Sequence, residues 1–481
     1  MFHTQRGGNL RPLGRRECQR FHDLLRRYAV DRVTAEEDPT RREAARRRLF
    51  AHYLDTADAA SRRLIPHFVR LPRTVAEDPF PDTEGASDWL DAEWSNLTAA
   101  VDRAAGSGPR CYAWHLADAL RAYFHQRGRQ EEWLAAATAG LDAARAEGDV
   151  RAQAAMHQSL ALAHVNSGRY DEARAHLVDG LRVNAVDSWQ DGRAGMLNNL
   201  SAVHQRLGDA QAAISCAHAS LELNRRLGID GGEVMSLANL GFAYWQLGAL
   251  GEAHDHFREA LERGERAGAR YNVAVLLVDL ASVHRDRGDH RAAAELYERA
   301  LTANRELGYR YGEATALAGR ALLRAGTGRS EPARADVVRA VELTREIGDT
   351  GTEAWVLDAL GRVLAELGRP DEAAAHHRQA LELARRTRFC WCEASALAGL
   401  AGALLAGGDP AGARRHGDAA RELATRAGYR LIEIRVSRTL ARARQRLGDA
   451  GEAVQLDERA ARLTRETGYV PLPAAAQPAG R

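Results

Sequence analysis

Residues 237–260 read LANLGFAYWQLGALGEAHDHFREA and place Gly248 between two helix-forming stretches. Small residues stand on both sides of this glycine, with Gly241 before it and Ala253 and Ala260 after it. A glycine can adopt the left-handed conformation that ends a helix, and small side chains allow two helices to approach closely. The stretch therefore predicts two short helices that pack together and are joined by a turn at Gly248.

The same glycine recurs every 40 residues along most of the chain. Nine copies stand at Gly128, Gly168, Gly208, Gly248, Gly288, Gly328, Gly368, Gly408 and Gly448. A second series with the same period falls between them, at Gly148, Gly228, Gly268, Gly308, Gly348, Gly428 and Gly468, with Ser188 and Arg388 in the two remaining positions. Two turns in each period indicate a repeat of two helices, each about 16 to 18 residues and about 25 Å long.

Other columns of the repeat support this interpretation. One column is alanine in every copy, at Ala173, Ala213, Ala253, Ala293, Ala333, Ala373, Ala413 and Ala453. A second is always small, at Ala161, Ser201, Gly241, Ala281, Ala321, Gly361, Ala401 and Ala441. Acidic residues that we expect to cap the following helices stand after the turns, at Asp171, Asp209, Asp289, Asp371 and Asp449. The fold class predicted is all-α, a superhelical solenoid of antiparallel helix pairs.

The order of residue types within each copy resembles the tetratricopeptide repeat (TPR) family. In the stretch quoted above, the motif positions are occupied by Leu237, Leu240, Gly241, Tyr244, Ala253, Phe257 and Ala260. The resemblance covers residues 151–467 as eight repeats, and a hairpin at 111–150 is a divergent copy because Arg121 and Trp133 replace small residues. The resemblance implies a concave surface, formed by the first helix of each repeat, that binds an extended peptide or a partner helix.

The two ends of the chain do not follow the 40-residue columns. In the linker region 31–110, Thr40 and Glu43 indicate a capping box that opens an Arg-rich helix ending at Leu64, and residues 87–105 indicate a second helix. The tail at 468–481 is rich in Ala and Pro and has no core residues, so we expect it to be disordered.

The N-terminal region carries a second resemblance. Residues 20–29, RFHDLLRRYA, resemble the helix that closes the winged-helix part of actinobacterial transcriptional regulators of the AfsR and SARP type, so 1–30 is interpreted as a remnant of that domain. HYL at 52–54 and WLDAE at 89–93 resemble the linker and next helix of the same family. The DNA-binding and nucleotide-binding domains of these regulators are not recognised here. The resemblance therefore implies their C-terminal TPR region, without DNA-binding or ATPase activity.

The residues needed for several kinds of chemistry are missing. The chain has no lysine, which excludes a P-loop nucleotide site and Schiff-base catalysis. Its five cysteines are scattered, and Cys390 and Cys392 are interpreted as structural. His164, His204 and His284 are interpreted as packing residues rather than metal ligands. We expect no enzyme activity, no cofactor and no metal, and, without a signal peptide or membrane-spanning stretch, a cytoplasmic location.

Motif position predicts which residues line the partner-binding groove. The candidates are Asn198, Asn199, Gln205, Asn239, Trp245, Gln246, Asp279, Arg285 and Asp286. An amide can bond a peptide backbone in either direction, and tryptophan offers a large contact area at small entropic cost. The alternative for each residue is an ordinary solvated helix position, or an asparagine that bonds the next repeat.

Two functions remain open. The first is a protein–protein interaction scaffold, a regulatory or sensor module linked to transcriptional control of a biosynthetic pathway, with a protein or peptide partner in the groove. The second is direct binding of nucleic acid by the Arg-rich head at 6–73, since residues 1–73 carry 17 Arg against nine Asp and Glu. Such a run is otherwise the solvated face of a helix. Neither function requires a membrane or a nucleotide.

Overall fold

The computed structural model describes residues 23–65, 68–187 and 189–471, and these residues form 21 α-helices and no β-strand. Three helices come first, α1 (Asp23–Glu36), α2 (Pro39–Leu64) and α3 (Thr83–Ser107). The divergent hairpin is α4 (Cys111–Arg127) and α5 (Gln130–Glu147). The eight pairs that follow are α6 (Val150–Asn166) and α7 (Tyr170–Asp187), α8 (Gln190–Leu207) and α9 (Ala210–Leu227), α10 (Asp230–Gln246) and α11 (Leu250–Arg266), α12 (Arg270–Asp286) and α13 (His290–Glu306), α14 (Arg310–Gly326) and α15 (Ser330–Ile347), α16 (Thr350–Glu366) and α17 (Pro370–Arg386), α18 (Cys390–Ala406) and α19 (Pro410–Ala427), and α20 (Arg430–Arg446) and α21 (Ala450–Thr467). The prediction of an all-α solenoid is confirmed.

The turns between helices have the geometry that the glycine series predicts. Gly208 and Gly408 have φ angles of 84° and 88°, in the left-handed region that favours glycine. Asp209 then caps α9 by accepting a hydrogen bond from the backbone N–H of Ala212 at 3.1 Å, and Asp289 caps α13 in the same way. These local interactions end one helix and begin the next.

The other three acidic residues do not bond the free N–H groups as caps, although Asp171 and Asp371 do lie at the positive ends of their helix dipoles. Asp171 and Asp371 lie inside the first turns of α7 and α17, and Asp449 makes no capping hydrogen bond. A carboxylate inside the first turn favours the positive end of the helix dipole but does not bond the free N–H groups as a cap would.

Both helices predicted for the linker region begin earlier than expected. The capping box at Thr40 and Glu43 is wrong, because α2 begins at Pro39 and its cap is Asp38, which accepts a hydrogen bond from the backbone N–H of Thr40 at 2.7 Å. Helix α3 begins at Thr83, where Asp82 supplies the cap. In each case an aspartate just before the expected start extends the helix.

The small columns are buried where neighbouring helices touch. Ala253 is fully buried, and a Cβ added to Gly241 would lie 2.7 Å from the ring of Phe257. The divergent hairpin packs against α6 of the next repeat, but α2 and α3 take the place that a preceding repeat has in the later copies. Its buried Arg121 donates a hydrogen bond to the carbonyl of Val69 in the linker. Arg121, which is larger than its counterparts in the later copies, thus packs against the linker region rather than against a repeat helix.

The inner side of the solenoid is formed by the first helix of each repeat. These inner helices are α6, α8, α10, α12, α14, α16, α18 and α20. Each inner helix from α6 to α20 contacts the inner helix of the next repeat, whereas the second helices of neighbouring repeats contact one another less. We call the side of the solenoid that these helices form the interior.

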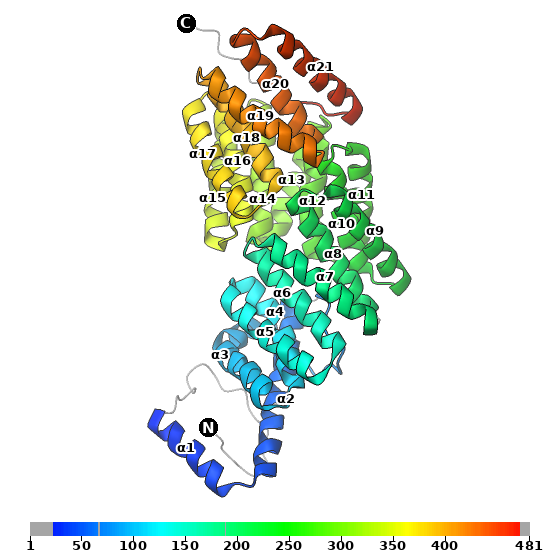
Figure 1. Ribbon diagram of the computed structural model, residues 1–481, viewed down its shortest axis with the longest axis vertical. Helices are drawn as coiled ribbons and strands as arrows, with labels where there is room; N and C mark the ends of the chain where they lie inside the picture. Colours follow the sequence, from blue (N-terminus) through cyan, green and yellow to red (C-terminus); the bar gives the residue numbers. More distant parts are fainter. Residues whose placement is uncertain (1–22, 66–67, 188, 472–481) are drawn as a thin grey trace.

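The solenoid completes one turn and closes on itself. In Figure 1 the orange helices α18 to α20 lie beside the green helices α8 to α12, and α18 contacts α8. The turn glycines of the first four repeats touch the opposite edge, with Gly168 against Thr387, Gly208 against Cys390, Gly248 against Arg430 and Gly288 against Val470. We call this line of contact the seam. The structure of residues 472–481, most of the tail expected to be disordered, lies outside the described residues, but Val470 donates its backbone N–H to the carbonyl of Asp286 at 2.9 Å.

Arg388 shows how one irregular turn serves the seam. It occupies a glycine position of the repeat, and it is the non-glycine residue with positive φ among those described, at 52°. Its guanidinium forms an ion pair with Asp171, 217 residues earlier in the chain. The left-handed conformation is unfavourable for a non-glycine residue, but here the Arg388 side chain joins the two edges of the seam.

We expect Arg388→Gly to be more stable than Arg388→Ala. Both variants lose the ion pair, which is exposed and contributes little, but only alanine retains the left-handed strain of about 1 kcal/mol. Urea unfolding followed by circular dichroism should show this difference in the free energy of unfolding. Equal stability of the two variants would contradict the strain at this turn.

Candidate functional site

The nine residues predicted to line the groove lie on three successive inner helices. Helix α8 carries Asn198, Asn199 and Gln205, α10 carries Asn239, Trp245 and Gln246, and α12 carries Asp279, Arg285 and Asp286. The four that remain half-buried are Asn198, Asn199, Asn239 and Asp279. The other five are buried, so the structure brings the nine together on one face but leaves only part of that face open.

Amide side chains join α8 to α10. Asn239 donates its Nδ2 to Oδ1 of Asn198 at 2.9 Å, and Gln205 donates its Nε2 to the carbonyl of Asn239 at 3.0 Å. These are the bonds between repeats that the alternative interpretation describes. Asn199 is half-buried beside them, and none of the hydrogen bonds among the described residues involves its side chain.

A second polar group joins α10 to α12. The indole Nε1 of Trp245 donates to Oδ2 of Asp286 at 2.8 Å, and Arg285 donates its Nε to Oδ1 of the same carboxylate at 3.0 Å. Burial by itself would lower the pKa of Arg285, but the charge of Asp286 beside it raises that pKa. The pair is therefore charged and satisfied within the chain.

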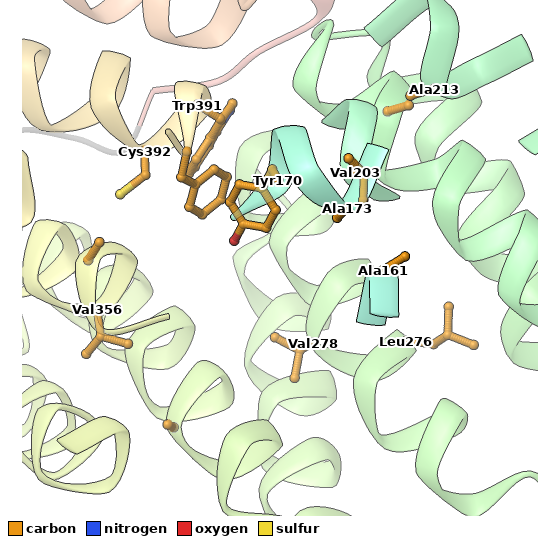
Figure 2. Close-up of a cluster of buried hydrophobic side chains, with 14 of the residues drawn as sticks. Ala161, Tyr170, Ala173, Val203, Ala213, Leu276, Val278, Val356, Trp391 and Cys392 are labelled. Atoms are coloured by element: carbon orange, nitrogen blue, oxygen red, sulfur yellow. The ribbon is translucent and has the colours of Figure 1, made fainter. Parts of the chain in front are cut away.

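The seam covers Trp245. Its ring lies 5.3 Å from that of Trp391 on α18, and Arg206 lies 4.2 Å from the ring centroid of Phe389 just before that helix. Figure 2 shows Tyr170, at the start of α7, beside Trp391 and Cys392. Aromatic contacts of this kind stabilise by about 0.5–1.5 kcal/mol each beyond their buried area. The structural interpretation of the segment 390–392 is consistent with this packing.

Two of the predicted residues are unusual. Gln246 is only 2% exposed, and neither its amide nitrogen nor its amide oxygen has a hydrogen-bond partner among the described residues. Burial raises the pKa of Asp279 to about 7. A buried amide without hydrogen bonds destabilises the fold by about 1–3 kcal/mol. The polar groups on this face therefore have fewer hydrogen bonds than those of an ordinary core.

The sequence prediction missed two arginines of the interior. Arg362 on α16 and Arg435 on α20 are partly buried, and Arg435 donates to Oγ of Ser395 on α18 at 3.2 Å. The four repeat columns that give the nine predicted residues do not contain them, because Arg362 stands in the column of Ser282 and Arg435 stands in the column of Ser395.

The histidines predicted to be packing residues make ring contacts. His164 stacks on His176 with centroids 5.3 Å apart, and His284 lies edge-on to His254 at 5.3 Å. Across the residues that the structure describes, no three His, Cys, Asp or Glu side chains form a group that could hold a metal ion. Nor does any described helix combine the length and apolar character needed to cross a bilayer.

Comparison with known proteins places these helices in context. A family model described as tetratricopeptide repeat matches residues 192–266, 272–346 and 313–386. The regulatory protein AfsR of Streptomyces griseus is 36% identical over 171 residues, which are 34% of this chain and 17% of AfsR, so the match spans a small part of that relative. A Rap protein complexed with Competence and Sporulation Factor aligns with 87% of this chain and 99% of its own length, with a TM-score of 0.50 and 9% identity, which shows the fold alone. The chain thus carries tetratricopeptide repeats over residues 192–266 and 272–386, and it resembles the AfsR-type regulators over part of its length.

Proposed function

We propose that this chain is a protein-interaction module that acts by binding rather than by catalysis. Its inner helices bind an extended segment of another polypeptide, and that binding regulates transcription of a biosynthetic pathway. What supports the proposal is the closed superhelical turn, together with the half-buried Asn199 and Asp279 and the amide of Gln246, which has no hydrogen-bond partner among the described residues.

The inner face suits an extended polypeptide better than a globular surface. The half-buried amide of Asn199 makes no hydrogen bond among the described residues, and it can bond a peptide backbone in either direction. A bound segment that supplied hydrogen bonds to Gln246 would remove the cost of burying that amide unpaired. The likeness to AfsR supports a regulatory setting for the interaction, and the Rap protein is a fold relative solved with Competence and Sporulation Factor bound.

Site-specific photo-crosslinking tests which face meets the partner. Met235 on the inner helix α10 is 36% exposed, and Val338 on α15, the second helix of its repeat, is 39% exposed. A photoreactive amino acid in place of Met235 should crosslink to a polypeptide in cells of the native host, and the same residue in place of Val338 should not. Crosslinks confined to position 338, or absent from both, would overturn the proposal.

The nucleic-acid alternative depends on the N-terminal head. Helix α2 extends away from the repeats towards α1 (Figure 1), and Arg41, Arg47 and Arg48 on it are exposed, although Arg47 pairs with Glu43 at 3.2 Å. If the interaction-module proposal is right, labelled duplex DNA should bind only weakly, and binding should vanish between about 50 and 200 mM salt. Tight, sequence-selective binding that requires residues 1–73 would favour the alternative.

A further inference from the structure

The inner helices of the last three repeats gather positive charge. Arg362 lies on α16. Arg435 and Arg442 lie on α20, and their spacing of seven residues, about two turns, puts them on the same face of that helix. Arg362 and Arg435 are partly buried and Arg442 is exposed. Between α16 and α20 runs α18, which carries Gly402 at the equivalent position of its repeat. Three arginines thus share one stretch of the interior.

The carboxylate whose charge acts on Arg362 is already bonded to other groups. Asp358 on α16 accepts a hydrogen bond from Ser395 at 2.7 Å through Oδ2, and its Oδ1 lies 2.9 Å from Nδ1 of His377. Among the described residues, no carboxylate oxygen lies within 4.0 Å of the guanidinium of Arg362 or Arg435. The Nε of Arg435 is buried without a hydrogen-bond partner. Arg362 and Arg435 therefore share one nearby carboxylate, Asp358, and both of its oxygens already bond other side chains.

The two guanidiniums are close enough for their charges to interact. Burial and then the charge of Arg435 lower the pKa of Arg362, while Asp358 acts in the opposite direction. Arginine nevertheless stays protonated at neutral pH. A buried charge is normally paired, because removing it from water costs several kcal/mol. The interior thus holds positive charge that the chain itself does not neutralise.

The inner helix α18, which lies between α16 and α20, has an open position at Gly402. A Cβ added to Gly402 would meet no described heavy atom within 4 Å outside its own helix backbone and chain neighbours, whereas one added to Gly399, a turn away, would lie 2.2 Å from the ring of His377. The inner face of α18 is therefore open at Gly402 and filled at Gly399. Space next to unpaired guanidiniums is what an oxyanion requires, since the planar fork of arginine bonds a carboxylate through two N–H groups.

We propose that Arg362 and Arg435, with Arg442 at the exposed edge, bind carboxylates of an acidic segment in the partner polypeptide. This inference rests on the proposed function, and it names the chemistry of the segment that the inner face recognises. A carboxylate and a phosphate are both oxyanions, but an extended acidic chain can also use the amides of Asn199 and Gln246 on the same face.

The first test measures stability without any ligand. Arg362→Met and Arg435→Met should each raise the melting temperature by a few degrees, because each removes an unpaired charge and keeps a side chain of similar length. Arg378→Met on the outer helix α17, where the arginine is exposed, is the matched control and should leave the melting temperature unchanged. A lower melting temperature for both interior variants would show that the guanidiniums serve packing, and would overturn the proposal.

The second test measures binding of a defined probe. Fluorescence anisotropy with a labelled glutamate octamer should show binding to the wild-type chain and to Arg378→Met, and at least 10-fold weaker binding to the double variant Arg362→Met, Arg435→Met. A glutamine octamer of the same length should not bind. If inorganic phosphate bound as tightly as the octamer, or if the double variant bound the octamer normally, the acidic-segment proposal would be wrong.

The two proposals fail in different ways. Crosslinking at position 235 together with normal octamer binding by the double variant would leave the interaction module in place and remove the arginine site. Loss of crosslinking at position 235 would remove the module itself, whatever the octamer does.

Discussion

Gly208→Leu is expected to open the seam, and Gly408→Leu is expected to leave it closed. Both glycines occupy the same turn of the repeat, with φ angles of 84° and 88°. A Cβ added to Gly208 would lie 2.8 Å from Sγ of Cys390 and 3.1 Å from the hydroxyl of Tyr429, whereas one added to Gly408 would meet no described atom within 4 Å. The two substitutions thus impose the same backbone strain, of about 1–2 kcal/mol, and differ only in the seam.

Gly208→Leu should therefore lower the free energy of unfolding by a further 1–3 kcal/mol or so, the usual cost of overpacking. Small-angle X-ray scattering should show a larger radius of gyration for Gly208→Leu than for Gly408→Leu. Tryptophan fluorescence should shift to longer wavelength as Trp245 separates from Trp391. Identical scattering curves and emission spectra for the two variants would mean that the edges are not held together in solution.

Asp279→Asn is expected to remove a loss of stability that the wild-type chain shows as pH rises from about 4 to about 7. An unfolded aspartate has a pKa of about 3.9, and burial raises the folded value to about 7. Within that window the folded chain binds more protons than the unfolded chain, so stability falls as pH increases. Above pH 7 the ionised carboxylate must be held in the interior.

The asparagine variant should be more stable than the wild type at pH 8 by about 1–3 kcal/mol, less than the full shift implies because Asp279 is partly exposed. At pH 4 the two should be nearly equal. Guanidinium unfolding at pH 4, 6 and 8 measures the difference, with Asp457→Asn on the exposed face of α21 as the control. Parallel stability curves for wild type and Asp279→Asn would show that water reaches this carboxylate freely.

The repeat could be predicted from the sequence because its determinants are local. A left-handed turn needs a glycine at one position, and close helix packing needs a small residue such as Gly241 opposite Phe257. Both requirements recur every 40 residues and involve only neighbouring helices. Helices α2 and α3 begin earlier in the sequence than predicted, because Asp38 and Asp82 supply their caps and belong to no repeat column.

Closure of the superhelix could not be predicted in this way. It depends on the small rotation between successive repeats, added over five or six of them, and it joins residues as far apart as Asp171 and Arg388. Gly208 and Gly408 are equivalent in the sequence, yet only Gly208 meets the C-terminal repeats. Trp245 lies on an inner helix, but its burial follows from contact with Trp391, which no local pattern reveals.

The seam should also change how the repeats unfold. Repeats that touch only their neighbours melt as a chain of separate units, and the ends fray first. Here the last residues after α21 bond Asp286 in the middle of the chain, and α18 contacts α8. Fraying at the C-terminus therefore disrupts the fourth repeat as well, which links distant parts of the array in one cooperative transition. A deletion of α20 and α21 would therefore also destabilise earlier repeats that lie far from these helices in the sequence.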